Sequence, residues 1–356
     1  MATMMGGATG VLSCLGVASL VASQGACSGG TEPVGETSEM TELAAICAVA
    51  RGRTLLFGGH GAYNDLFGLR ARIVRFDRGA KRAAVVHDGE GNVIDASCPG
   101  GGTIAALVRR VRPGTPDVVR DYWLLVSRDD GDTWRRSELP PQDSLAYVEL
   151  LDARRGWVLG YGGAFATNDG GVSWSAVPDP PDAELVKNLL GWPRGGGAVT
   201  FQEGRLELRD GRLAIRRSRE LGAGVKVQCI ARSGRDRLLA IVKTEDAGRR
   251  RAGALEVRLP GLETVREIEG LPEDFVCGNA AGGPRGAAVA GANVDSAGFF
   301  GISHSAFALA DGASELGRLR TKSEREAVLA FDGPRPIVGQ AVLTGAAFRV
   351  RVRRSR

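Results

Sequence analysis

Short apolar segments alternate with turn residues along most of the chain. A turn that contains Gly, Pro or Arg and leads into a short apolar run recurs seven times, beginning at Arg51, Pro99, Arg154, Pro193, Arg232, Gly283 and Asp332. Successive recurrences are 39 to 55 residues apart, close to the roughly 40–50 residues of a four-stranded repeat unit. The pattern therefore predicts an all-β domain over residues 42–356, made of seven four-stranded antiparallel blades.

The fifth repeat shows the expected strands most clearly, as runs at residues 225–231, 238–243, 252–259 and 264–268. Turn residues that punctuate such runs are Asp88-Gly89, Asp210-Gly211 and Asp311-Gly312. Residues 182–190 fit a strand or a short capped helix, and the period favours a strand.

The last repeat offers too few strands to complete a blade. Its three runs are residues 326–331, 336–343 and 347–352. Because a closed ring protects sheet edges, the missing edge strand would come from residues around Met40 or be left short.

One eight-residue motif, Ser/Thr-x-Asp-x-Gly-x-Thr/Ser-Trp, occurs twice, as SRDDGDTW at 127–134 and TNDGGVSW at 167–174. Its defined positions are Ser127, Asp129, Gly131, Thr133, Trp134, Thr167, Asp169, Gly171, Ser173 and Trp174. The short polar side chains can accept hydrogen bonds from turn amides, and the glycines permit the positive φ of a tight turn. The tryptophans return on the next strand, where they can pack between neighbouring sheets.

This motif resembles the Asp-box of the bacterial neuraminidase repeat family of β-propellers. The longer string around the second copy, from Gly156-Trp157 to Trp174, looks like the repeat of the photosystem II stability and assembly factor family. The resemblance covers about residues 120–177 and implies a seven-bladed β-propeller with non-catalytic relatives. An irregular Gly-rich β-sandwich is the alternative fold.

The N-terminus has the pattern of an export signal. Residues 11–23 form an apolar run that suits a secretory signal, and Cys27 follows small residues and precedes Ser28-Gly29-Gly30. This resembles a bacterial lipoprotein cleavage site, so residues 1–27 are expected to be a signal peptide and Cys27 the lipidated residue. Because Gln24 replaces the usual aliphatic residue and no Lys or Arg precedes Arg51, an ordinary cleaved signal and an unprocessed N-terminus are alternatives.

Export would place the protein outside the cytoplasm. Residues 28–41 are rich in Gly, Ser, Thr and Glu and are expected to form a flexible linker. The other four cysteines each end an apolar segment just before a recurrent turn, at Cys47, Cys98, Cys229 and Cys277. If these segments are the innermost strands of adjacent blades, disulfides Cys47–Cys98 and Cys229–Cys277 are predicted; four buried thiols are the alternative.

The composition adds few chemical constraints. Apolar residues make up 43% and charged residues 24%, the net charge is +5, and 52 glycines suit many turns. No apolar run approaches the ~20 residues of a membrane-spanning helix. The three histidines, His60, His87 and His304, lack metal-ligand spacing, so neither a metal nor a cofactor is predicted. The Arg-rich end of the chain fits a solvated strand, and contact with anionic lipid headgroups or a cell-surface polymer is the alternative; nucleic-acid binding is not expected.

These observations favour an exported, non-enzymatic binding or scaffold protein. Its ligand would be a partner protein, such as an envelope complex under assembly, or a surface saccharide. A sialidase-like glycoside hydrolase is one alternative, but the four tyrosines, Tyr63, Tyr122, Tyr147 and Tyr161, lack a recognisable nucleophile context. A structural envelope protein without a specific ligand is the other alternative.

Overall fold

Strands and the turns between them account for the described part of the chain. The computed structural model describes residues 31–49, 52–61, 68–78, 80, 82–112, 120–142, 144–161, 163–178, 189–192, 195–202, 204–246, 249–283, 286–294, 302–310, 313–323, 328–332, 335–344 and 347–355. Within these ranges every strand belongs to one of seven four-stranded antiparallel sheets. Among the same residues, no helix is long and apolar enough to cross a membrane.

Six of the sheets are blades, each made of four consecutive strands. Blade 1 contains β2 (Glu42–Val49), β3 (Arg53–His60), β4 (Arg70–Phe76) and β5 (Ala84–Glu90). Blade 2 contains β6 (Asn92–Gly100), β7 (Thr103–Val111), β8 (Arg120–Ser127) and β9 (Arg135–Glu138). Blade 3 contains β10 (Leu145–Leu150), β11 (Gly156–Gly160), β12 (Gly163–Thr167) and β13 (Ser175–Ala176).

The remaining blades follow the same order. Blade 4 contains β14 (Leu190–Trp192), β15 (Gly197–Gln202), β16 (Arg205–Arg209) and β17 (Ile215–Glu220). Blade 5 contains β18 (Val225–Arg232), β19 (Arg237–Asp246), β20 (Arg249–Arg258) and β21 (Glu263–Ile268). Blade 6 contains β22 (Phe275–Gly283), β23 (Gly286–Val294), β24 (Ile302–Ala310) and β25 (Gly317–Ser323).

The closing sheet joins the two ends of the described chain. It contains β26 (Val328–Asp332), β27 (Arg335–Thr344) and β28 (Ala347–Ser355), with β1 (Thr31–Thr37) paired on the outer edge of β28. The prediction of seven blades within residues 42–356 is therefore wrong. In the described part of the chain, that range supplies six complete blades and three strands of a composite sheet.

The flexible linker predicted at residues 28–41 is also wrong over its described part. Residues 31–37 form β1, and Met40 is fully buried, whereas residues 28–30 lie outside the described residues. The physical reason is that the outer edge of β28 exposes unpaired backbone groups, which any extended segment can pair with through its own backbone. A polar, Gly-containing composition does not reveal this pairing.

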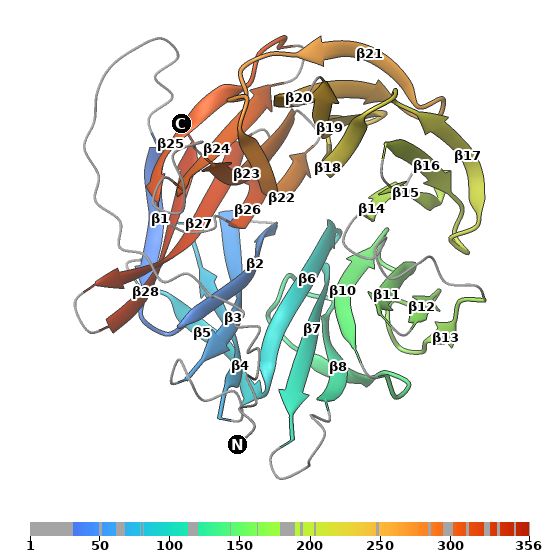
Figure 1. The fold of residues 1–356 in the computed structure, drawn as a ribbon. Helices are drawn as coiled ribbons and strands as arrows, with labels where there is room; N and C mark the ends of the chain where they lie inside the picture. The colour runs from blue at the N-terminus through green and yellow to red at the C-terminus, as the bar shows by residue number, and fades with distance from the viewer. Residues whose placement is uncertain are drawn as a thin grey trace, which may run out of the picture.

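The blades surround a central axis, and the first strand of each lies innermost (Figure 1). Inner strands of successive blades contact one another, and β26 of the closing sheet contacts both β22 and β2. The described strands thus form a closed ring.

The hydrophobic core lies between the sheets. Along β7, Ile104, Ala106 and Val108 pack into the cluster shared with blade 1, whereas Ala105 and Leu107 pack into the cluster shared with blade 3. Because both faces of the strand are covered, its sequence is a continuous apolar run and does not alternate with polar residues. This burial provides the main driving force for stacking successive blades.

The expected local structure is largely present where it is described. The four strands predicted in the fifth repeat correspond to β18–β21, and Asp210-Gly211 lies in the turn between β16 and β17. Asp88-Gly89 was wrongly expected to form a turn. Both residues belong to β5, where the Asp88 carboxylate pairs with Arg70 and Arg72 on β4. Asp311-Gly312 and residues 182–188 lie outside the described residues.

Candidate functional site

The second motif forms a tight turn between β12 and β13 that is organised by one carboxylate. Asp169 Oδ2 accepts a hydrogen bond from Ser173 Oγ at 2.6 Å, and Asp169 Oδ1 accepts from the backbone N–H groups of Ser173 and Val172. Thr167 Oγ1 accepts from the N–H of Gly171, whose φ is +82°. These hydrogen bonds, foremost that from the Ser173 hydroxyl, hold the pKa of Asp169 well below its ordinary value.

The first motif repeats this geometry between β8 and β9. Asp129 accepts from the hydroxyl and the N–H of Thr133 at 2.6 and 2.9 Å, and Ser127 Oγ accepts from the N–H of Gly131 at 2.9 Å. Gly131 has a φ of +85°. Two turns 40 residues apart therefore share one hydrogen-bond pattern, which follows from their shared side chains.

Each motif turn packs against the preceding blade. Asp132, in the first turn, forms ion pairs with Arg53 and Arg75 of blade 1 at 2.9 and 2.6 Å. Trp134 contacts Phe57 of blade 1 edge to face, with ring centroids 6.0 Å apart. In the second turn, the Asp169 carbonyl accepts a hydrogen bond from Arg128 of blade 2 at 2.6 Å, and Trp174 packs against the cluster between blades 2 and 3. The motif residues thus hold neighbouring blades together.

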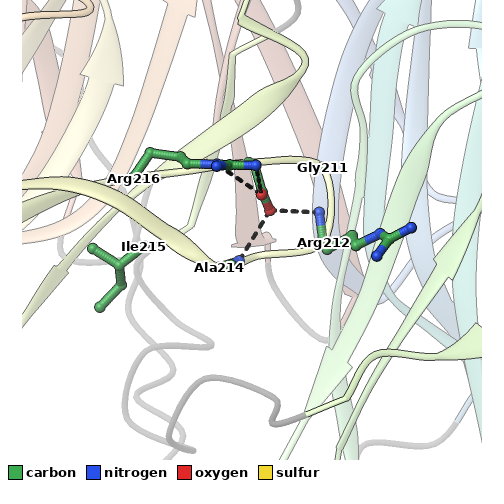
Figure 2. A pocket seen from close by; sticks show the side chains of 6 residues that line it. Gly211, Arg212, Ala214, Ile215 and Arg216 are labelled. Carbon is green, nitrogen blue, oxygen red and sulfur yellow. Dashed lines mark hydrogen bonds and ion pairs between the residues drawn. The ribbon is translucent and has the colours of Figure 1, made fainter.

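A third turn of related design lies in blade 4, and sequence reasoning missed its role. The Asp210 carboxylate accepts hydrogen bonds from the N–H groups of Arg212 and Ala214 and pairs with Arg216 at 2.7 Å (Figure 2). Trp157 of blade 3 donates its indole N–H to the Gly211 carbonyl at 3.1 Å. The signal in the sequence is the position of Asp210, 41 residues after Asp169.

Side chains of the inner strands bind the free backbone edges of their neighbours. Asp95 Oδ2 on β6 accepts a hydrogen bond from the Val148 N–H on β10 at 2.8 Å. Ser97 Oγ accepts from the Leu150 N–H, also at 2.8 Å. Because the first strand of a blade has no sheet partner on its inner side, its backbone groups need such acceptors.

Blade 4 is held between its neighbours through one glycine. Gly191 on β14 donates its N–H to Glu149 Oε1 of blade 3 at 3.1 Å, and its carbonyl accepts from Arg232 of blade 5 at 2.6 Å. Burial raises the pKa of Glu149, and the Arg232 guanidinium opposes this rise. Burial lowers the pKa of Arg232, and Glu149 opposes that change. The two charged groups therefore stabilise each other across the three-residue inner strand.

Asp95 occupies an unfavourable place for a carboxylate. Its side chain keeps some accessible surface, but the carboxyl group is enclosed by the protein, and this burial raises its pKa to about 7. The hydrogen bonds from the backbone of Val148 and Ala96 oppose the rise, whereas nearby Glu149 adds to it. Tyr147 is close enough that Asp95 contributes to its raised pKa, although burial is the main cause.

Two disulfides join inner strands elsewhere in the ring, one between blades 1 and 2 and the other between blades 5 and 6. Cys47 on β2 is bonded to Cys98 on β6, and Cys229 on β18 is bonded to Cys277 on β22, with a Cα–Cα distance of 6.1 Å in each pair. Both join the innermost strands of adjacent blades, as the repeat period predicts. Beside the second bond, the Gln228 side chain donates to the Phe275 carbonyl and accepts from the Cys277 N–H.

A cleft opens at the seam between blades 3 and 4. Its volume is about 510 Å³, and residues from both blades line it, among them Arg155, Asn168, Val177, Gly211 and Arg212. Arg155 is paired with Asp152 at 2.7 Å. Arg212 is exposed and extends away from the Asp210 carboxylate (Figure 2). The cleft therefore combines a cationic side chain, amide and hydroxyl groups, and apolar surface.

The structure does not bring all candidate residues to one place. The motif residues lie at the turns between the third and fourth strands of blades 2 and 3, whereas the four bonded cysteines lie on inner strands. Cys27 lies outside the described residues, as does Tyr63. Tyr122 is buried and Tyr161 is exposed. Within the described ranges, no group of three or more His, Cys, Asp or Glu side chains could hold a metal ion.

Comparisons with known proteins show the fold. No protein-family model matches the chain, and a comparison with curated proteins finds no match. Among solved structures, the chain is similar to YCF48 bound to D1 peptide, at 15% identity and a TM-score of 0.55, over 90% of this chain and 96% of that chain.

Two further solved structures give the same result. A GH74 enzyme of Niastella koreensis is 12% identical with a TM-score of 0.56, over 86% of this chain but only 52% of that one. U3-55K is 12% identical with a TM-score of 0.53, over 92% of this chain and 100% of that one. At these identities the likeness defines the class, an all-β β-propeller with four-stranded antiparallel blades.

Proposed function

We propose that the chain is an exported, non-enzymatic β-propeller that binds a partner protein. The observation that carries this proposal is the likeness, along nearly the whole of both chains, to YCF48 bound to D1 peptide. The Asp-box resemblance of the two motif turns points to the same group of propellers. The N-terminal pattern ending at Cys27 supports export and lipid anchoring.

The cleft between blades 3 and 4 is the best-supported contact surface for the partner. It lies at the seam between two sheets, and it offers both polar and apolar lining residues. At its edge, β13 is only two residues long and outermost in its sheet. A short outer strand leaves room for an extended polypeptide to approach the sheet.

The chemistry of the inner carboxylates supports a non-enzymatic role. Asp95 and Glu149 both accept hydrogen bonds from backbone N–H groups of the next blade. Their principal interactions therefore maintain the ring. The partner we propose is a protein of the cell envelope, such as a subunit of a complex under assembly.

Site-specific photo-cross-linking tests this proposal. A photoreactive residue is placed at Asn168 or Ala176 in the cleft, or at Val85 on the outer strand of blade 1 as an exposed control. We expect one cell-envelope polypeptide to cross-link reproducibly from both cleft positions and not from Val85. Equal labelling from all three positions, or capture of saccharide alone, would contradict a protein-binding cleft.

A further inference from the structure

The outer edge of β13 leaves backbone groups without a partner in the sheet. Ala176 of β13 is opposite Phe165 of β12, and the next residue, Val177, donates its N–H to the Ala164 carbonyl at 2.9 Å. In an antiparallel pair, residues that exchange hydrogen bonds with the neighbouring strand alternate with residues that do not. Ala176 therefore directs its N–H and C=O away from β12, and β13 is the last strand of its sheet.

This unpaired edge lies in the cleft between blades 3 and 4. Ala176 and Pro178 are both exposed, and both line the cleft. The open edge of a sheet is a template for an extended polypeptide, which pairs with it through its own backbone. Because β13 contains only two residues, few backbone hydrogen bonds can form there. Specific binding at this edge therefore also requires side-chain contacts.

The charged side chains that line the cleft are basic. They are Arg155 of blade 3 and Arg212 of blade 4, and no acidic side chain is among the described residues of the lining. Arg155 is paired with Asp152 at 2.7 Å. Arg212 extends away from the carboxylate of Asp210 (Figure 2), which pairs with Arg216 at 2.7 Å. The cleft thus carries a positive charge that its own lining does not neutralise.

We propose that the cleft binds an extended, acidic segment of the partner, which adds a strand to the edge of β13 and places carboxylates beside Arg212 and Arg155. This inference rests on the protein-binding function proposed above and names the chemistry of the bound segment. Backbone pairing with Ala176 sets the path of the segment. The arginines select carboxylates, because one guanidinium can donate two parallel hydrogen bonds to a carboxylate. An added strand directs successive side chains to opposite sides, so acidic residues at every second position lie on one side.

Fluorescence anisotropy with labelled synthetic peptides tests the proposal on the full chain. The probes are a peptide in which Glu alternates with Val and its counterpart in which Lys replaces Glu. We expect the Glu peptide to bind, with weaker binding as salt is added, and the Lys peptide not to bind. Arg212→Glu should weaken binding of the Glu peptide about tenfold. The matched control is Arg235→Glu, in an exposed turn of blade 5, which should leave binding unchanged.

A second pair of variants separates strand addition from charge attraction. Ala176→Pro removes the N–H that points away from β12, and proline is tolerated at such positions of an edge strand, so the ring should remain folded. We expect Ala176→Pro to weaken binding of the Glu peptide, whereas Ala176→Ser keeps the N–H and should not. Equal affinity of Arg212→Glu and Arg235→Glu, or binding that Ala176→Pro leaves unchanged, would overturn the proposal. So would binding of the acidic polysaccharide alginate without binding of the Glu peptide.

Photo-cross-linking from Asn168 distinguishes failure of this inference from failure of the proposed function. If a cell-envelope polypeptide cross-links as strongly to Arg212→Glu as to the unsubstituted chain, a protein binds the cleft but an acidic segment is not what it recognises. If no polypeptide cross-links from the cleft, the protein-binding function itself is wrong. We expect cross-linking to the unsubstituted chain and to Arg235→Glu, and a loss of cross-linking to Arg212→Glu.

Discussion

Glu149 on β10 accepts a hydrogen bond from the backbone N–H of Gly191 on β14, and this contact crosses the seam between blades 3 and 4. A Cβ atom added at Gly191 would lie 2.5 Å from Glu149 Oε1 and 2.9 Å from Leu151 Cδ2. Relieving these contacts would require the Glu149 or Leu151 side chain to move, and a shift of Glu149 would disturb its hydrogen bond to the Gly191 N–H.

Gly191→Ala is therefore expected to destabilise the protein by about 1–3 kcal/mol, as overpacking of a buried site does. Gly253→Ala in β20 is the matched control, because the nearest atom to its added Cβ is Val242 Cγ2 at an ordinary 3.5 Å. Chemical denaturation of both variants measures the difference. Equal stability of the two variants would show that the seam does not require glycine.

Asp169→Ala should destabilise the second motif turn by about 2 kcal/mol, because a charged acceptor of several hydrogen bonds is lost. Asn168→Ala, at the exposed neighbouring position, is the control and should have little effect.

The stabilisation by Asp169 should also depend on pH. The pKa of Asp169 is lowered in the folded state, so its contribution to the free energy of unfolding is present above the unfolded-state pKa. That contribution should disappear as the pH falls through the lower folded-state value. Denaturation of both variants at neutral and acidic pH measures these effects, and identical profiles would contradict a structural role for the carboxylate.

Asp95→Asn should make the protein more stable at alkaline pH than the unsubstituted chain. Burial raises the pKa of Asp95 in the folded state to about 7, from the ordinary 3.8 of an aspartate. The folded protein therefore holds the proton more tightly, and the Asp95 contribution to stability falls as the pH rises from about 4 to 7.

Asparagine keeps an acceptor for the Val148 N–H but carries no charge. The free energy of unfolding of the variant minus that of the unsubstituted chain should rise by on the order of 1–3 kcal/mol between pH 5 and pH 8. Denaturation of both proteins at the two pH values measures this difference. Asp236→Asn, in an exposed turn, serves as the control. If Asp95→Asn leaves the pH dependence of stability unchanged, burial does not raise the pKa of this carboxyl group.

A fluorogenic sialoside should not be hydrolysed by the purified protein. We expect the unsubstituted chain and the Glu149→Gln and Tyr147→Phe variants to give the same background rate, because the Glu149 carboxylate accepts a hydrogen bond from the backbone N–H of Gly191. Turnover that either substitution abolishes would favour the glycosidase alternative. A known sialidase assayed in parallel establishes the sensitivity of the measurement.

Much of the architecture can be predicted from the chain because it depends on local, repeated patterns. The motif turns follow from short polar side chains and glycines at fixed spacing, and the position of each cysteine before a turn indicates an inner strand. Packing between sheets can also be predicted, since a continuous apolar run such as that of β7 indicates a strand covered on both faces.

The remaining features depend on contacts between distant segments. Pairing of β1 with β28 uses backbone groups alone, so the composition of residues 31–37 suggests a linker instead. Asp95, Glu149 and Arg232 look like ordinary surface charges in the sequence, because only the ring places a free backbone edge beside them. The third turn is not recognisable as a copy of the motif, because the other four defined positions around Asp210 are occupied by Leu208, Arg212, Ala214 and Ile215.

Non-reducing peptide mapping of the protein is the sharpest test that successive inner strands surround one axis, because both disulfides join neighbouring inner strands. We expect two linked peptide pairs, one containing Cys47 and Cys98 and the other Cys229 and Cys277. Each pair joins adjacent blades, with 51 and 48 residues between the bonded positions. Four free thiols, or a bond that joins Cys47 or Cys98 to Cys229 or Cys277, would rule out this arrangement of inner strands.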